Sequence, residues 1–340
     1  MELTQLLERL CALDGISGDE TAAAEFICSQ LDGKCEYSAD ALGNIIAFKK
    51  GEKSSGKKLM LCAHMDEVGL IVTNINKDGT LSFGTVGGVD SNVLFGKRVY
   101  VSKERHLGVI ASKAVHNLSK DEKKKALSTD ELVIDLGMSE EQAKKCVNLG
   151  DSVVFDSQFL RFGNGMLKGK AIDDRAGCAI LLMLLENELK YDTYFVFTVQ
   201  EEVGLRGASA ATFAIKPDFA VVIEATTAAD IPSSNGAKRV CEVGKGAVVS
   251  YMDRRTIYDK ELYSLAWETA EECNLPCQTK TMVAGGNDAG TISVTASGVR
   301  TAAISLPCRY LHTPSSVISE SDLISTYELV KHFAERIHLL

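Results

Sequence analysis

The first seventy residues combine apolar positions at helical spacing with two short apolar runs. Intervals of three and four residues between leucines predict an amphipathic helix over residues 3–13. Ser17 and Glu20 stand three residues apart before a second such pattern, which predicts a helix opened by a capping box. The runs at 44–48 and 59–63 are typical of strands. We therefore expect helices packed against a sheet.

The character of the chain changes after this segment. Short β-like runs alternate with turn signals, and in order they read IVTNI, LSFGTV, RVYV, GVIAS, ELVID and SVVF. Residues 77–80 (KDGT) are typical of a hairpin turn, and Ser139 with Gln142 opens a short helix over 140–147. This pattern predicts a small β-rich domain inserted into a larger one.

An α/β rhythm returns after the insertion. The expected elements are helices over 175–190, 258–273 and from Ser319 onward, and strands over 194–199, 219–223 and 301–306. Alternating strands and helices predict an α/β fold whose mostly parallel sheet is covered by helices on both faces. We expect the larger domain to comprise residues 1–70 plus 165–340, and the inserted domain residues 71–164.

Composition narrows the class of protein without identifying it. The 340 residues carry a net charge of −9 and no basic stripe, so we expect no nucleic-acid partner. The stretch 120–125 mixes lysines with acids, and we interpret it as a solvated loop or helix end. No run approaches the roughly 18 apolar residues of a membrane span, and the N-terminus has no apolar signal core. Ten cysteines without a CxxC motif are typical of free thiols, so we expect a cytoplasmic protein.

Acids and histidines gather where the expected strands end or a helix begins. They are His64 and Asp66, Asp173 and Asp174, Glu201 and Glu202, Glu224, and His312. In open α/β sheets, ligands bind outside the carboxyl ends of the strands. Each signal alone has an ordinary alternative, such as a core histidine, a helix cap for the aspartate pair or a solvated turn for the glutamate pair. Their joint occurrence favours a binding site.

This set of residues suits divalent metal ions. Histidine and carboxylate ligands favour zinc or a similar first-row ion. One catalytic zinc needs fewer ligands than the chain offers, whereas two ions sharing a bridging carboxylate would use all five candidates, His64, Asp173, Glu202, Glu224 and His312. Asp66 lies two residues from His64 and can orient its imidazole. We expect two divalent ions, with zinc preferred over cobalt or manganese.

Five motifs, in this order, resemble a known family. They are HMDE at 64–67, AIDDRAG at 171–177, QEEVGLRGA at 200–208, GGNDAG at 285–290 and RYLHTPSS at 309–316. Together with SGDE at 17–20 and the β-rich insertion, they resemble the tetrahedral and glutamyl aminopeptidases of clan MH, which are dinuclear metallopeptidases. The resemblance spans nearly the whole chain. It implies a zinc-peptidase-like catalytic domain with an inserted small β-barrel or PDZ-like domain.

The resemblance also implies metal-ligand roles. These are terminal ligands His64 and Glu202, bridging ligand Asp173, and completing ligands Glu224 and His312. Asp173 is preferred to Asp174 because the bridging acid stands four residues before the helix glycine, here Gly177. The peptide bond between the two aspartates is expected to be cis.

Two positions depart from the family pattern. Glu224 stands where the family usually has aspartate, and because it offers the same oxygens we expect it still to bind metal. Asn287 stands where the family often has threonine. Its neighbour Asp288 is expected to contact the substrate amine or to buttress the site.

The expected activity is removal of the N-terminal residue from short peptides. Glu201 is the expected general base, because on an extended segment it would point away from the ligand Glu202 and toward the attacking water. Arg309 and Tyr310 join Asp288 as candidates for substrate binding. Arg206 is a further candidate for the site.

The resemblance further implies a homo-oligomer in which the inserted domain joins dimers that assemble into twelve-subunit tetrahedral shells. His116 lies in that domain, and either a structural role or a contact at the interface or pocket rim fits its position.

Three other functions stay open at the level of sequence. Glu224 is a mild argument for a carboxypeptidase or deacylase of the same clan. A glycoside hydrolase is another alternative, since some relatives are labelled endoglucanases, but it would leave the histidines unexplained. A scaffold with a vestigial metal site is the non-enzymatic alternative, and the presence of both His64 and Glu201 argues against it.

Overall fold

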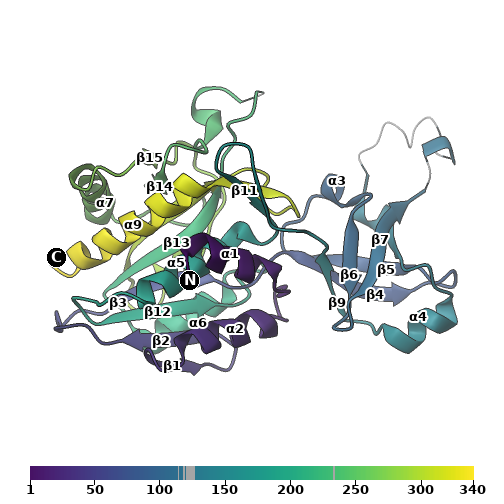
Figure 1. The fold of residues 1–340 in the computed structure, drawn as a ribbon, viewed down its shortest axis with the longest axis horizontal. Coiled ribbons are helices and arrows are strands. Elements are labelled where there is room, and N and C mark those ends of the chain that lie inside the picture. Colours follow the sequence, from purple (N-terminus) through teal and green to yellow (C-terminus); the bar gives the residue numbers. More distant parts are fainter. Residues whose placement is uncertain (114, 118, 120–126, 233) are drawn as a thin grey trace.

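The computed structural model describes residues 1–113, 115–117, 119, 127–232 and 234–340. It consists of a large part built on one sheet and a smaller β-barrel at one end (Figure 1). The expected α/β fold with an inserted β-rich barrel is therefore confirmed. The lysine-containing stretch 120–125, expected to be a solvated loop or helix end, lies outside the described residues.

The large sheet has its strands in the order β1-β2-β12-β3-β13-β16-β14-β15. The central strands β12, β3, β13 and β16 run parallel. β1 and β2 are antiparallel to their neighbours, and β14 is antiparallel to β16 but parallel to β15. The strands comprise β1 Glu36–Ala39, β2 Ile45–Lys49, β3 Leu59–His64, β12 Thr193–Thr198, β13 Phe219–Thr227, β14 Ala247–Val249, β15 Cys277–Thr279 and β16 Arg300–Cys308. Because the order is not sequential, the carboxyl ends of strands far apart in the sequence meet at one edge.

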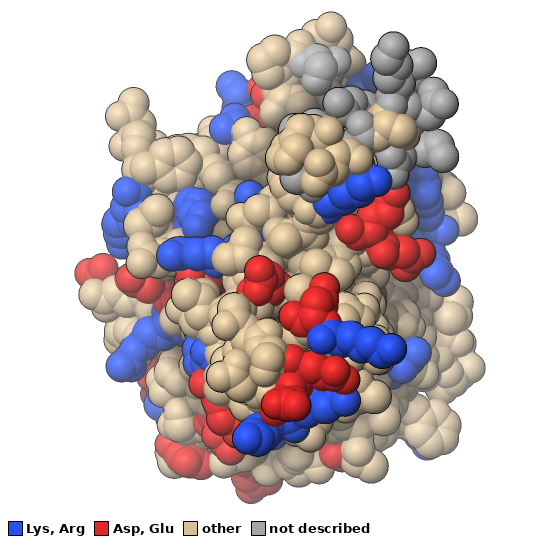
Figure 2. All heavy atoms as spheres, turned by 90° about the vertical axis from the view of Figure 1, so that its right-hand side faces the viewer, with Lys and Arg blue, Asp and Glu red and all other residues tan. Residues whose placement is uncertain are grey.

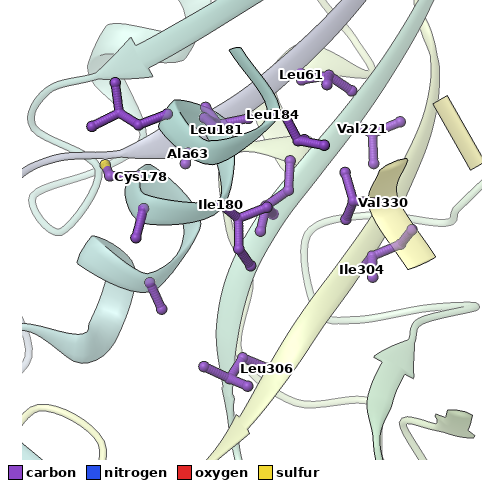
Figure 3. Packing of buried hydrophobic residues seen from close by; sticks show 14 of the residues in the cluster. Leu61, Ala63, Cys178, Ile180, Leu181, Leu184, Val221, Ile304, Leu306 and Val330 are labelled. Atoms are coloured by element: carbon purple, nitrogen blue, oxygen red, sulfur yellow. The ribbon is translucent and has the colours of Figure 1, made fainter. Parts of the chain in front are cut away.

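Helices cover both faces of this sheet, because successive side chains of a strand point to opposite faces. Leu61 of β3 belongs to the same hydrophobic core as α5 (Ile172–Leu185). Its neighbour Cys62 belongs to a second core, which includes α6 (Arg206–Ile215). Figure 3 shows how side chains of α5 lie among those of the sheet and of α9; the labelled residues include Ile180, Leu181, Leu184, Val221, Ile304 and Val330.

The other helices of the large part are α1 Leu3–Ala12, α2 Thr21–Leu31, α7 Lys260–Glu272, α8 Ala289–Ile292 and α9 Glu320–Ile337, with the 3-10 turn η4 Gly236–Arg239. Residues of α1, α2, α7 and α9 belong to the same core as α5, and α8 packs with α6. Among the residues that the structure describes, no helix is long and apolar enough to cross a membrane.

The capping box expected before α2 is wrong. The helix begins at Thr21, and no side chain caps it. Ser17 Oγ donates instead to Asp66 Oδ2 at 2.6 Å, and Glu20 Oε1 accepts from the backbone N–H of Gly18 at 2.8 Å. A tertiary contact with the acid that follows β3 therefore replaces the local cap.

Other elements differ from the expected bounds. β13 continues through Glu224 to Thr227, so this acid lies within the strand and not after it. α5 begins before the expected residue 175, with non-helical backbone angles at Asp173 and Asp174, and ends at Leu185. The helix α6 has no counterpart among the expected elements. Its small residues give a weak apolar pattern, and packing on the sheet stabilises it.

The barrel is closed, with the order β4-β5-β8-β7-β6-β9. Its strands are β4 Gly69–Ile75, β5 Leu81–Val86, β6 Arg98–Val101, β7 His106–Ser112, β8 Leu132–Asp135 and β9 Ser152–Phe155; its helices are α3 Ser91–Leu94 and α4 Glu140–Cys146, with 3-10 turns η1 Val115–Asn117 and η3 Thr129–Glu131. The expected hairpin turn is confirmed, because Asn76 N donates to Thr80 O at 2.8 Å between β4 and β5. The capping box of Ser139 and Gln142 opens α4 as expected.

A small third sheet lies where the chain returns from the barrel. β10 Leu160–Phe162 pairs with β11 Met166–Gly169, which pairs with β17 Ser316–Ser319 of the large part. The chain thus leaves the large sheet after β3 and returns through this sheet. The division at residues 71 and 164 stays a prediction.

Candidate active site

A cavity of about 920 Å³ opens beside the carboxyl ends of β12 and β13. Its wall includes Glu201 and Glu202, which follow β12, and Glu224 of β13. Gly88 and Asp90, from the part of the chain between β5 and α3, line it as well. The large sheet and the barrel segment therefore both contribute to one site.

The carboxylate of Asp173 lies between two histidines. Its Oδ1 is 3.3 Å from Nε2 of His64, and its Oδ2 is 3.4 Å from Nε2 of His312. His64 Nε2 also lies 3.4 Å from Glu224 Oε1, and His312 Nε2 lies 3.4 Å from Glu202 Oε1. Each histidine thus has its own glutamate, and they share one aspartate.

Both histidines present the same nitrogen to this cluster. Nδ1 of His64 is 3.0 Å from the Asp66 carbonyl oxygen, and Nδ1 of His312 is 3.0 Å from that of Gly88. A carbonyl oxygen can only accept, so Nδ1 carries a proton, and Nε2 is the nitrogen that could bind a metal ion. Such a bond to the second ring nitrogen is typical of metal-binding histidines.

The distances fit ligands around metal ions better than ion pairs. Two ligand atoms, each about 2.1 Å from a tetrahedral ion, lie about 3.4 Å apart. Charge-assisted N–H···O bonds are shorter, about 2.7–2.9 Å. Oε1 of Glu202 and Oε2 of Glu224 are buried without a hydrogen-bond partner. These buried oxygens and nitrogens therefore form a set of donors suited to divalent cations.

Asp173 and Asp174 differ in their surroundings although both are buried. Asp174 Oδ1 accepts from the backbone N–H of Gly177 at 2.9 Å and so caps the helical part of α5. The peptide bond between the two acids is cis, as expected. Either aspartate can complete a group of three ligand atoms within 4.8 Å of one another, His64–Asp174–Glu224 or His64–Asp173–Glu202. Only Asp173 contacts both histidines among the described residues.

The acids of the cluster differ in the direction of their pKa shifts. Burial raises the pKa of Asp173, but His312 and His64 outweigh it and hold that pKa well below its usual range. Burial and the neighbouring Asp173 raise the pKa of Glu202 to about 7. Burial raises the pKa of Glu201 well above its usual range, although His64 opposes the shift. The cluster therefore holds more acids than its histidines can neutralise.

Asp66 holds the loop that carries the paired glutamates. Its Oδ1 accepts from the backbone N–H of Glu201 at 3.0 Å, and its Oδ2 accepts from that of Glu202 at 3.2 Å. Gln200 has a φ of 56°, so the segment is not extended, and both glutamates line the cavity. The expected extended segment is therefore wrong here, because β12 ends at Thr198.

Several sequence candidates lie outside the lining of this cavity. Arg309 forms a bidentate pair with Asp230, with both N–O distances 2.6 Å, and the Tyr310 side chain is exposed. Asp288 is buried and accepts from Thr198 Oγ1 at 2.6 Å, a position that buttresses the end of β12. Arg206 begins α6, and His116 is exposed in η1. The structure brings none of these sequence candidates to the cavity wall.

The structure adds residues that sequence reasoning missed. Ser17 supports Asp66, and Gly88 orients His312. Cationic side chains line the cavity as well, namely Lys238, Arg254, Arg255 and Lys280. The sequence offers no signal for these cations, because they come from separate loops with no shared motif.

Solved structures define the class of protein. A TET aminopeptidase from the marine sediment archaeon Thaumarchaeota archaeon SCGC AB-539-E09 superposes with a TM-score of 0.94 at 33% identity, covering 98% of this chain and 96% of that one. The TET1 peptidase of Pyrococcus horikoshii, described as assembling into a tetrahedron or a large octahedral shell, gives 0.87 at 31%, covering 98% and 99%. A structure described as an endoglucanase from Thermotoga maritima gives 0.81 at 38%, covering 98% and 97%. The fold is that of an aminopeptidase.

The sequence comparison identifies the family. The family model described as M42 glutamyl aminopeptidase matches residues 43–329. The chain is 32% identical over 345 residues to the lysyl aminopeptidase of Pyrococcus furiosus, covering 98% of this chain and 97% of that one. It is 25% identical over 343 residues to the glutamyl aminopeptidase of Lactococcus lactis, covering 97% and 95%. The chain belongs to the M42 aminopeptidase family, which confirms the resemblance, and it is a hydrolase that acts on peptides.

Proposed function

We propose that this protein removes the N-terminal residue from short peptides with the help of two divalent metal ions. The observation that carries the proposal is the Asp173 carboxylate, which lies between two histidines that each have a second carboxylate 3.4 Å away. One ion would be held by His64, Asp173 and Glu224, and the other by His312, Asp173 and Glu202. Zinc suits this set, with cobalt or manganese as alternatives.

Bound ions of this kind polarise a scissile carbonyl and lower the pKa of water. The residues of the chain then have separate tasks. Glu201 accepts the proton of the attacking water and delivers it to the leaving amine, because it is a carboxylate in the cavity that belongs to neither ligand set. Asp66 is a positioning residue, since it holds the backbone of Glu201 and Glu202.

Glu201→Gln tests this assignment of the base. The amide keeps the size of the side chain but cannot accept the proton, so we expect hydrolysis of leucine p-nitroanilide to fall by about 10³-fold or more. Metal content, measured by plasma mass spectrometry, should stay at the wild-type value. The matched variant Glu202→Gln should lower metal content, because it changes a ligand. Near-normal turnover by Glu201→Gln would refute the assignment.

Two alternative activities are weaker. A carboxypeptidase or deacylase of the same clan would cleave N-acylated substrates in preference to aminoacyl anilides, and assays on both kinds would separate them. A glycoside hydrolase uses two carboxylates on either side of the scissile bond and no metal. Such a mechanism leaves the two histidines of the cluster without a role. Loss of activity on chelation would favour the peptidase.

We also propose a homo-oligomer assembled through the barrel, up to a tetrahedral dodecamer. The barrel end carries acidic and basic side chains interspersed with uncharged surface (Figure 2). In the barrel segment, Phe95, Leu107 and Val109 are exposed by 56%, 52% and 43%, which supports a contact surface. Small-angle scattering would distinguish a 36.7 kDa monomer from a shell of about twelve chains. For the compartment we propose the cytoplasm, because buried free thiols such as Cys62 and Cys178 are typical of reducing conditions.

A further inference from the structure

The two histidines of the cluster are held by different parts of the chain. The His64 side chain is 1% exposed, and its Nδ1 lies 3.0 Å from the carbonyl oxygen of Asp66, two residues further along. The His312 side chain is 31% exposed, and its Nδ1 lies 3.0 Å from the carbonyl oxygen of Gly88. Gly88 follows β5 of the barrel. One imidazole is therefore oriented from within the large part, and the other from the barrel segment.

The loop that carries His312 is irregular. It connects β16 to β17, and the φ angles of Tyr310 and His312 are 59° and 57°. The ring faces Asp173 and Glu202 through Nε2 and the Gly88 carbonyl oxygen through Nδ1. A ligand ring keeps its direction through the contact of its second nitrogen, so the position of the Gly88 backbone governs where Nε2 points.

The register of the barrel explains why this backbone reaches the site. Val86, the last residue of β5, pairs with Gly69, the first residue of β4. Gly69 stands five residues after His64, so the end of β5 returns to the place where the chain leaves the large sheet. Gly87 and Gly88 come next, and they form a turn beside the cluster.

Gly87 packs against the second ligand of the same group. A Cβ atom built there would lie 3.2 Å from Cβ of Glu202 and 2.8 Å from Cγ1 of Val68. The φ of Gly87 is 80°, a left-handed value that favours glycine. Both the backbone and the surrounding side chains therefore require glycine at this position.

Gly88 differs from Gly87 because only the space around it is restricted. Its φ lies outside the left-handed region and does not itself demand glycine. A Cβ atom built there would lie 3.2 Å from Nδ1 and 3.5 Å from Cε1 of His312, and the shorter distance is tighter than ordinary van der Waals contact. A methyl group at Gly88 would push the ring aside and move Nε2 relative to the two carboxylates.

We propose that Gly87 and Gly88 are positioning residues for one of the two proposed ions. That ion is the one assigned to His312, Asp173 and Glu202. Resting on the proposed function, this role makes the binding of one ion depend on the barrel segment, whereas the other ion depends on residues of the large part. The lack of side chains lets the turn lie against both ligands, and the Gly88 carbonyl oxygen accepts from Nδ1 and so directs Nε2.

Gly88→Ala tests this role through the zinc that the protein retains. Zinc-loaded protein is dialysed against buffers of graded free zinc concentration, and the bound zinc is counted by plasma mass spectrometry. Wild-type protein should hold two ions per chain at high free zinc. In Gly88→Ala, one ion should need about 10- to 100-fold more free zinc, as for other changes around metal-binding histidines. The other ion should be retained within about twofold of the wild-type concentration.

Gly84→Ala is the matched control. Gly84 lies in β5, and its φ is also outside the left-handed region. A Cβ atom there would lie 3.7 Å from the side chains of Ile71 and Thr73, which is ordinary contact. We expect this variant to retain both ions as the wild type does. An equal loss of zinc in Gly84→Ala and Gly88→Ala would overturn the role of the turn, because any methyl group in this segment would then disturb the site.

A double variant shows whether the effect passes through the imidazole. His312→Ala should retain one ion, and adding Gly88→Ala should change the affinity for that ion by less than about twofold, because no ring is left to displace. General damage to the fold would weaken the remaining ion in the double variant as well, and that result would overturn the proposal. Gly87→Ala should weaken the same ion as Gly88→Ala, and its φ of 80° should also lower Tm.

The outcomes separate this role from the proposed function. If Gly88→Ala retains both ions with wild-type affinity, the positioning role is overturned, while the two-ion aminopeptidase stands. Equal weakening of both ions in this variant overturns it too, since the turn would then support the site as a whole. Wild-type protein that binds fewer than two ions at saturating zinc would overturn both the positioning role and the two-ion function.

Discussion

The barrel and the large part of the molecule differ in the polar and charged side chains that they bury. The barrel core consists of apolar side chains such as Val72, Val99 and Ile134, and among its described residues no polar or charged side chain is buried. The large part buries many, including His64, Asp66, Asp173, Glu201 and Glu224, all 8% exposed or less.

The apolar interior favours stability of the barrel, whereas the buried acids of the large part serve its proposed function. A closed barrel satisfies its backbone without edges, and an apolar interior needs no partners for charges. The acids of the large part repel each other, and several carry raised pKa values because burial disfavours their charged forms. Bound cations would offset this repulsion. Without them, the buried acids lower the stability of the large part, whereas the described residues of the barrel core carry no such charges.

The largest effect is expected from Asp173→Asn, which changes the charged site of the large part. An amide cannot supply an anionic oxygen to each of the two proposed ions, so we expect the bound metal to fall to one ion per chain or fewer. Aminopeptidase activity should fall on the order of 10³-fold. Metal analysis and the hydrolysis rate of leucine p-nitroanilide measure the two effects.

Asp174→Asn is the matched control. Its remaining oxygen can still accept from Gly177, so we expect α5 and the metal content to stay intact. Loss of metal in Asp174→Asn together with retention in Asp173→Asn would move the bridging role to Asp174.

Ile134→Ala probes the apolar core. Ile134 is fully buried in the barrel, and its truncation should lower the free energy of unfolding by about 2–5 kcal/mol. Because the residue lies outside the site, kcat per folded molecule should not change. Urea titration and assays below the transition measure these quantities.

Leu149→Ala supplies the comparison for that variant. This leucine is 65% exposed, so its loss should change the unfolding free energy by no more than about 0.5 kcal/mol. A tenfold fall in kcat of folded Ile134→Ala would mean that the barrel core and the active site are not independent.

The smallest effect concerns pH. In protein stripped of metal, burial and Asp173 raise the pKa of Glu202 to about 7. The folded state therefore binds this proton more tightly than the unfolded chain does, and the resulting stabilisation is lost as pH rises from about 4.5 to 7. Burial lowers the pKa of His312, but Asp173 and Glu202 outweigh it and raise that pKa to about 9. The stabilisation by this imidazolium is therefore full below about 6.5 and lost as pH rises to 9.

Both shifts have the same sign, so Tm of the metal-free protein should fall by about a few degrees between pH 5 and 9. Protein loaded with zinc should vary less, since the ion replaces the protons. Differential scanning calorimetry of the two forms makes the comparison. A metal-free Tm that rises over this range would contradict the charge assignment.

Much of the fold follows from local patterns. The barrel strands repeat at regular intervals between turn signals, and several helices of the large part, such as α1, have clear apolar periods. The local rule failed at Ser17, where a contact with Asp66 replaced the cap, and at Gln200, where a left-handed residue ended the strand alternation. Both failures lie beside the cluster of histidines and carboxylates, where tertiary interactions between charged groups outweigh local preference.

The sequence by itself determined which residue types stand at the strand ends, and hence that histidines and carboxylates are available for divalent ions. Only the tertiary structure decided that His64 associates with Glu224 and His312 with Glu202, because the strand order places β3 between β12 and β13 and brings His312 in from beyond β16. It also decided that Lys280 lines the same cavity, since three strand pairings connect β13, β16, β14 and β15 in that order. Pairing across a sheet joins residues that are distant in the chain, and no local sequence pattern predicts which strands become neighbours.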